Sequence, residues 1–153
     1  MSSERSKQRV LFLCTGNSCR SQMAEGFLRD FAGDDFEVAS AGVYPTRINP
    51  LAIRVMAEAA VDISEQYSKS VDEMTAQYFD YVITVCDRAR EACPVVLRAA
   101  RRLHWSFEDP ADATGAEEDR LSVFRRVRDE ISAQVRQFVS KVGRGRVCDE
   151  PSN

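Results

Sequence analysis

The sequence predicts an α/β protein with a four-stranded parallel sheet flanked by helices on both faces. Short apolar segments of strand length alternate along the chain with amphipathic segments of helical period. Such alternation indicates parallel strands joined by right-handed crossovers. The 153 residues, 44% of them hydrophobic, suffice for one domain with a sizeable core. We place this catalytic domain at residues 9–142, between a disordered N-terminus at 1–8 and a flexible tail at 143–153.

The first half of the chain predicts two strands and two helices. The apolar run at 10–13 predicts a strand, and a helix then extends to about Ala32, ended by Gly33. Its apolar positions recur at helical spacing: Met23, Ala24, Phe27, Leu28 and Phe31. Residues 36–40 predict the second strand, with a loop beginning at Ala41. Asn49 and Pro50 are favoured at a helix start and predict the second helix. Its predicted apolar face holds Ile53, Met56, Ala57 and Ala60.

The second half predicts two further strands and a long final helix. Ser70 and Glu73 have the spacing of a capping box, which predicts a short helix over 71–78. The apolar segment 81–85 predicts a strand buried on both faces, and 103–107 predicts the fourth strand. The final helix, 117–142, has one apolar face made of Leu121, Phe124, Val127, Ile131, Val135 and Phe138.

The loop between the first strand and the first helix has the features of an oxyanion site with a nucleophile at its floor. Cys14 ends the strand, and Gly16 allows a tight turn. The loop N–H groups then converge at a helix N-terminus, which favours anions. Arg20 can hold two oxygens of a tetrahedral oxyanion. With Arg20 and the Ser21 hydroxyl beside it, Cys14 is expected to have a lowered pKa and to be a thiolate. A buried cysteine and a surface arginine are the commoner alternative for such a pair in proteins at large.

Composition excludes several other functions. The net charge of −3 gives no support to a nucleic-acid partner, and no apolar run is long enough to cross a membrane. The polar segment 1–8 lacks the apolar core of a signal peptide, so we expect a cytoplasmic protein. The five cysteines of a cytosolic chain are then more often catalytic, redox-active or metal-binding than structural disulfides. His104 is the only histidine and lies within a predicted strand, so we interpret it as structural.

Several candidate residues fall at the carboxyl ends of the predicted strands. They are Cys14, Ser40, Cys86 and the loop after Phe107, which contains Asp109. Active sites of parallel sheets lie at this edge, so we expect the four stretches to converge there.

Cys86 and Cys93 form a second pair of interest. If the segment between them is helical, seven residues rise about 10 Å, beyond the roughly 7 Å limit on the Cα separation of a disulfide. The pair could bridge only if this short polar segment, stopped by Pro94, unwound. Two unrelated buried cysteines are the alternative on spacing alone.

Three segments resemble a known family. The run CTGNSCRSQMAEG from Cys14 resembles the signature loop of low-molecular-weight protein tyrosine phosphatases and of the arsenate reductases that share their fold. CDRAREACPV from Cys86 is similar to the redox segment of the thioredoxin-coupled arsenate reductases. HWSFEDPA from His104 resembles the segment whose aspartate before proline is the general acid, here Asp109.

The resemblance implies reduction of arsenate to arsenite by three thiols in relay. Cys14 would be the nucleophile, Cys86 the first resolving thiol and Cys93 the second. Asp109 would be the general acid. The oxyanion, arsenate or a phosphate-like ion, would be bound by the loop residues Thr15, Gly16, Asn17, Ser18, Cys19 and Arg20.

The same resemblance implies thioredoxin as the reductant and no cofactor, and we expect a monomer with neither nucleic acid nor membrane as a partner. Glutaredoxin or a low-molecular-weight thiol stays open as the reductant. The Cys19 side chain is interpreted as packed and structural, and Cys148 in the tail as a bystander.

Two alternatives remain. A phosphatase needs only Cys14, Arg20 and Asp109, but residues 111–113 lack the aromatic side chains that usually flank a phosphotyrosine in this fold, and only Tyr44 in another loop favours that function. A thiol sensor or arsenic-binding module would leave Arg20 and Asp109 unexplained.

The resemblance also implies a support site behind the loop. Many such reductases have a potassium site there, whose Asn, Glu and Ser match Asn17, Glu25 and Ser40. The remaining two ligands, usually Thr and Asp, are replaced here by Tyr67 and Lys69. We therefore expect no metal, and hypothesise that the Lys69 ammonium replaces it and holds Asn17 and Glu25; the alternative is that Lys69 points into solvent.

Overall fold

A parallel sheet and the helices packed against it form the framework. The computed structural model describes residues 7–86 and 98–142. Its elements, in chain order, are β1 (Gln8–Cys14), α1 (Arg20–Ala32), β2 (Phe36–Gly42), α2 (Pro50–Glu58), the 3₁₀ helix η1 (Val71–Met74), β3 (Tyr78–Thr84), β4 (Arg98–His104), the 3₁₀ helix η2 (Pro110–Asp112) and α4 (Glu117–Val142). None of the described helices is long and apolar enough to span a bilayer.

The predicted four-stranded parallel sheet is confirmed, in the order β2-β1-β3-β4. From β1 the chain first forms β2 on one side and then crosses to β3 on the other. The carboxyl end of β1 therefore lies where the strand order reverses, which is where ligands bind in such sheets. Cys14 is the last residue of that strand.

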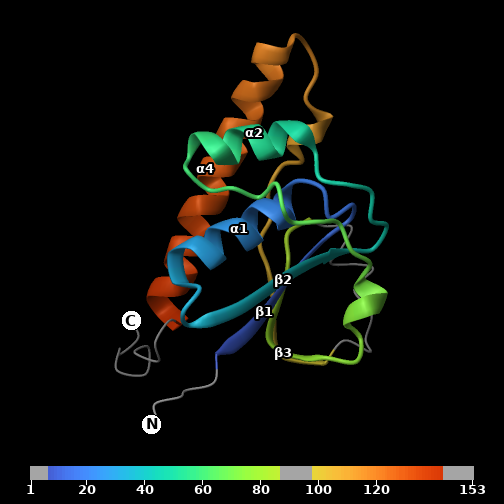
Figure 1. Cartoon of the computed structure of the whole chain (residues 1–153), viewed down its shortest axis with the longest axis vertical. Coiled ribbons are helices and arrows are strands. Elements are labelled where there is room, and N and C mark those ends of the chain that lie inside the picture. The colour runs from blue at the N-terminus through green and yellow to red at the C-terminus, as the bar shows by residue number, and fades with distance from the viewer. Residues whose placement is uncertain (1–6, 87–97, 143–153) are drawn as a thin grey trace.

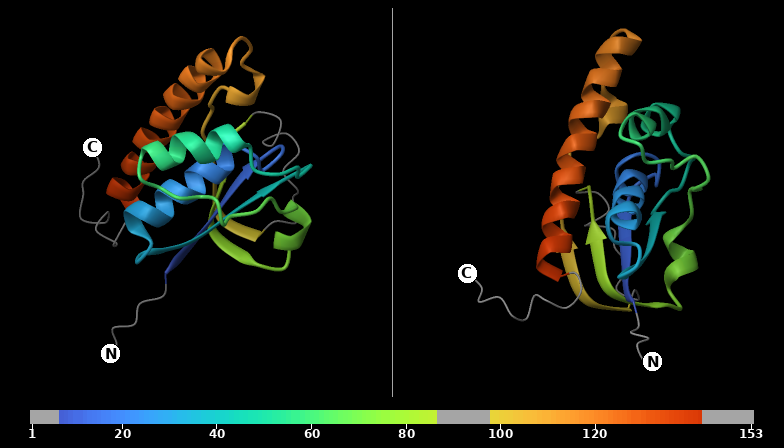
Figure 2. Two further views of the ribbon diagram at one scale, coloured as in Figure 1. Left: turned by 45° about the horizontal axis from the view of Figure 1, so that its top comes forward. Right: turned by 60° about the vertical axis from the view of Figure 1, so that its left-hand side comes forward.

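The two faces of the sheet are covered differently. Figure 1 shows α1, α2 and α4 together on one side, where Val10 and Phe12 of β1 join the larger apolar core. Leu11 and Leu13 point to the opposite face and pack with Val71 of η1 in a second core. In Figure 2 the N-terminal part of α4 extends beyond the sheet, with α2 beside it. Strand alternation thus gives each face its own core.

The predicted face of the second helix is confirmed only in part: Met56 is buried and Ile53 packs against the core, whereas Ala57 is exposed. The buried residues of α2 are Ala52, Val55 and Met56. Residues 51–53 and 55–57 are all apolar, so their periodicity does not single out one face. The helix also ends at Glu58, and Ala60 has a positive φ of 65° beyond its end.

Other boundaries differ from the prediction. The capping box of Ser70 and Glu73 is present, but it starts a single 3₁₀ turn over Val71–Met74, because the chain joins the sheet from Tyr78. β2 extends to Gly42, which pairs with Cys14, and Gln8 already belongs to β1.

The fourth strand lies earlier than predicted, at Arg98–His104. It is an edge strand whose side chains are exposed or half-buried, so it lacks an apolar period. Trp105 and Phe107, which suggested a strand, instead pack on the core from the loop that follows, with the Trp105 ring 5.7 Å from that of Phe12. The predicted boundaries of the final helix are confirmed.

Candidate active site

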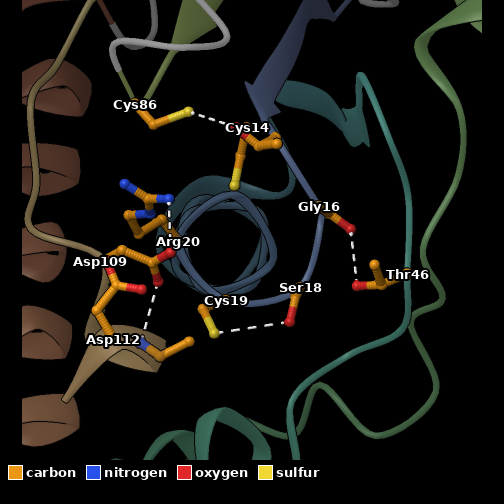
Figure 3. A pocket seen from close by; sticks show the side chains of 11 residues that line it. Cys14, Gly16, Ser18, Cys19, Arg20, Thr46, Cys86, Asp109 and Asp112 are labelled. Atoms are coloured by element: carbon orange, nitrogen blue, oxygen red, sulfur yellow. Dashed lines mark hydrogen bonds and ion pairs between the residues drawn. The ribbon is translucent and has the colours of Figure 1, made fainter.

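A cavity of about 450 Å³ opens at the carboxyl edge of the sheet, at the end of β1. Its lining residues are Cys14, Thr15, Gly16, Ser18, Cys19, Arg20, Thr46, Cys86, Asp109, Ala111 and Asp112. Figure 3 shows the loop from β1 curving around this space, with Arg20 and Asp109 facing each other beside it. The structure thus brings together three of the four predicted stretches, while the fourth, at Ser40, lies behind the loop.

Backbone hydrogen bonds turn the loop's carbonyl groups outward. They accept from N–H groups of the segment after β2: Cys14 from Val43, Thr15 from Tyr44, Gly16 from Thr46 and Ser18 from Asn49, at N···O distances of 2.8–3.2 Å. In a trans peptide unit the N–H points opposite to the carbonyl. The following N–H groups therefore point toward the inside of the loop, where they form a concave anion site.

Asn17 is the residue about which the loop turns. It has a positive φ of 51° and is fully buried; asparagine tolerates this conformation better than most residues. Its amide nitrogen donates to the hydroxyls of Ser21 and Ser40, at 2.9 Å each. Its amide oxygen accepts from the backbone N–H of Lys69 at 2.9 Å, so the whole side-chain amide is used to fix the loop.

Arg20 begins α1 and lines the cavity. Its guanidinium donates to the carbonyl of Phe107 at 3.1 Å and forms an ion pair with Asp109 at 3.3 Å. The buried Nε–H has no acceptor among the described residues. Buried donors normally have a hydrogen-bond partner, and an oxygen of an oxyanion held by this arginine would accept from this Nε–H.

Cys14 and Cys86 lie together at the floor of the cavity, and both are buried. The hydrogen bond with the Cys86 thiol and burial raise the pKa of Cys14 well above its usual value, although Arg20 and a hydrogen bond from Ser21 lower it. The predicted lowered pKa of Cys14 is therefore wrong. The sequence indicated both Arg20 and Cys86 near Cys14, but not that burial and the Cys86 thiol would outweigh Arg20 in setting its pKa.

Asp109 stands at the mouth, as the N-cap of η2, where its carboxylate accepts from the N–H of Ala111 at 3.0 Å. The ion pair with Arg20 directs it toward the oxyanion site. Asp112 and Thr46 also line the cavity but were missed by sequence analysis, since single polar loop residues give no signal.

The other cysteines divide into two groups. Cys19 is buried, and burial raises its pKa to about 12, which fits the predicted structural role of its side chain. Cys93 and Cys148 lie outside the described residues, as does the predicted helical turn between Cys86 and Cys93. His104, also predicted to be structural, contacts Thr84 Oγ1 through Nδ1 at 2.7 Å.

Comparison with known proteins identifies the family. A family model described as low molecular weight phosphotyrosine protein phosphatase matches residues 9–147. The chain belongs to this family. It is 47% identical over 132 residues to an arsenate reductase of Halalkalibacterium halodurans, covering 86% of this chain and 95% of the relative.

Two solved structures of arsenate reductases have a fold similar to that of this chain. An arsenate reductase in the phosphate-binding state superposes with a TM-score of 0.77 at 34% identity, covering 88% of this chain and 98% of that one. A thioredoxin-dependent arsenate reductase of Corynebacterium glutamicum gives a TM-score of 0.70 at 28% identity, covering 90% of this chain and 63% of that one.

The hypothesis that the Lys69 ammonium replaces a metal ion and holds Asn17 and Glu25 is wrong. The ammonium donates to the carbonyl of Tyr67 at 3.1 Å and lies 4.5 Å from that ring's centroid, while only the backbone of Lys69 holds Asn17. The cation at Glu25 is instead Arg29, one turn along α1, at 2.6 Å. The spacing of this pair, i to i+4 on a helix, was the available sequence signal.

The oxygens of this site do not fit a potassium ion. One oxygen of Glu25 accepts from Ser40 and the other from Arg29, each at 2.6 Å. The amide oxygen of Asn17 is likewise occupied by an N–H group. A metal ion would have to displace the Arg29 guanidinium, which is already paired with the Glu25 carboxylate.

Proposed function

We propose that the protein reduces arsenate to arsenite through a relay of Cys14, Cys86 and Cys93, with thioredoxin as the final reductant. The arsenate reductases among its relatives support the substrate, and the thioredoxin-dependent relative supports the reductant. One observation carries the proposal: the second buried thiol, Cys86, beside Cys14 at the floor of the oxyanion cavity. Phosphate hydrolysis does not need that thiol, whereas reduction does.

Binding places arsenate, an isostere of phosphate, in the loop. The inward N–H groups and the N-terminus of α1 neutralise its charge. Arg20 contributes two N–H groups, including the buried Nε–H that has no acceptor among the described residues. The arsenic atom then lies above the sulfur of Cys14.

The first chemical step forms a sulfur–arsenic bond. The Cys14 thiol loses its proton and attacks arsenic. Asp109 enters this step protonated and gives its proton to the departing oxygen, which leaves as water; the carboxylate that remains pairs with Arg20. Because burial and the Cys86 thiol raise the pKa of Cys14, the entering oxyanion is the base that accepts its proton.

The second step is the redox step. The Cys86 thiolate attacks the sulfur of Cys14 and forms a disulfide. The sulfur–arsenic bond breaks, its electron pair stays on arsenic, and arsenite leaves. Cys93 then attacks Cys86, which frees Cys14 and moves the disulfide to Cys86 and Cys93. An external dithiol has poor access to a disulfide at the floor of an anion cavity, so this transfer precedes reduction by thioredoxin.

Arsenite production with thioredoxin, thioredoxin reductase and NADPH tests the proposal. Wild type should turn over many times, and Cys93→Ser should stop at about one equivalent of arsenite per enzyme, as expected for a relay without its last thiol. Multiple turnover by Cys93→Ser would contradict the relay.

Hydrolysis of phosphate esters is the second candidate, because Cys14, Arg20 and Asp109 are also the residues that it needs. Cys93→Ser should retain any aryl phosphatase activity. Brisk hydrolysis by wild type without arsenate turnover would make phosphatase the main activity.

A further inference from the structure

We propose that Arg29 is a positioning residue that serves as the built-in cation of the oxyanion loop. Arg29 lies outside the cavity, and its side chain is 48% exposed. Its guanidinium nevertheless joins three segments: Glu25 of α1, the carbonyl of Val38 in β2 at 3.0 Å, and Gln66 at 3.0 Å. The inference rests on the proposed function only in taking the loop as the oxyanion site.

The first connection from Arg29 to the loop runs through side chains behind it. Arg29 holds one oxygen of Glu25, whose other oxygen accepts from the Ser40 hydroxyl. The Ser40 oxygen in turn accepts from the Asn17 amide at 2.9 Å. The Ser40–Glu25 and Asn17–Ser40 bonds are buried and so shielded from water, while the Arg29–Glu25 bond is partly buried.

The second connection runs through two glutamines. Arg29 donates to the side-chain oxygen of Gln66, whose amide nitrogen donates to the side-chain oxygen of Gln22 at 2.7 Å. Gln22 then donates to the backbone carbonyl of Asn17 at 3.1 Å. One guanidinium therefore fixes both the side chain and the backbone of the residue with positive φ.

Asn17 passes this constraint to the nucleophile. It donates to the oxygen of Ser21, which leaves the Ser21 hydroxyl hydrogen for the sulfur of Cys14. Both connections require the planar guanidinium of Arg29, because a lysine ammonium cannot reproduce its divergent donors. A point charge such as potassium would satisfy Glu25 but could not donate to Gln66.

The test measures binding of inorganic phosphate by calorimetry, which does not require arsenate reduction and so separates this inference from the proposed function. Arg29→Ala should weaken phosphate binding about 10- to 100-fold, the range typical of groups that orient a binding residue from behind. Arg54→Ala is the matched control: the Arg54 side chain is about as exposed as that of Arg29 and also forms a 2.6 Å ion pair, with Glu117, and the variant should stay within about twofold of wild type.

Three further measurements exclude a merely structural role. Millimolar guanidinium should restore phosphate binding to Arg29→Ala, and Arg29→Lys, which keeps the charge and protects folding, should still bind weakly. Wild-type phosphate affinity should be equal in potassium chloride and choline chloride. Unchanged affinity in Arg29→Lys, or strong potassium dependence of wild type, would overturn the proposal.

Discussion

The sulfur of Cys86 lies 3.2 Å from the hydroxyl of Thr15, so the segment after β3 contacts the first residue of the oxyanion loop. This contact keeps the Cys86 thiol at the floor of the cavity, where it hydrogen-bonds with Cys14 and raises the pKa of the nucleophile. The two thiols therefore share a protonation equilibrium before any substrate binds.

Replacing Cys86 by alanine should lower the pKa of Cys14, because the interaction that raises it most is removed while Arg20 and Ser21 still stabilise the thiolate. The pH midpoint of Cys14 alkylation by iodoacetamide, followed peptide by peptide, should move to lower pH. Cys19 is an internal reference, since burial raises its pKa to about 12. An unchanged or higher midpoint for Cys14 would contradict the shared equilibrium.

Asp109→Asn should separate binding from chemistry. The amide oxygen can still accept from the N–H of Ala111, but the side chain can no longer donate a proton, so kcat for arsenate should fall about 10²- to 10⁴-fold. Phosphate should bind more tightly, because the carboxylate that pairs with Arg20 is gone. Weaker phosphate binding would show that Asp109 mainly orders the site.

The charge of Asp112 should affect how readily arsenate binds. Its exposed carboxylate lines the mouth of the cavity and repels an approaching dianion. Asp112→Asn should lower KM for arsenate about two- to fivefold, as expected for a screened surface charge, with kcat nearly unchanged. The effect should vanish at high ionic strength, and a change in kcat as large as that of Asp109→Asn would contradict it.

The arrangement of the site could be predicted because parallel strands bring their carboxyl ends to one edge. Cys14, Cys86 and the loop with Asp109 reach the cavity in this way. The sign of the Cys14 pKa shift could not be predicted, since it depends on burial and on a thiol brought near by the fold.

Two other predictions failed because the sequence does not show where the Lys69 side chain points or that β4 lies at the edge of the sheet. Lys69 was placed correctly behind the loop, but only its backbone acts there, and the charge comes from Arg29. β4 was misplaced because an exposed edge strand with three arginines has no apolar alternation. Apolar periodicity in a sequence predicts buried faces. It does not predict a strand or a supporting side chain that remains exposed.

Gly42 should be essential for the shape of the loop. A Cβ at this position would lie 2.7 Å from the carbonyl oxygen of Thr15 and 2.8 Å from the backbone nitrogen of Asn17, both main-chain atoms that cannot rotate away. Gly42→Ala should therefore displace the loop and reduce arsenate turnover about 100-fold, as a shift of about 1 Å in a reacting group can do.

Gly16→Ala is the matched control for Gly42→Ala, because its Cβ would come within 3.4 Å of the Thr46 side chain alone, at 3.3 Å, and would meet Ser18 Cβ at 3.7 Å and the Tyr44 carbonyl at 3.9 Å in ordinary contact. That variant should keep phosphate binding within a few-fold of wild type, since a side chain can yield where a backbone cannot. Both variants should retain the circular dichroism of the parallel sheet. If Gly42→Ala binds phosphate as tightly as Gly16→Ala, the close approach of β2 does not shape the oxyanion site.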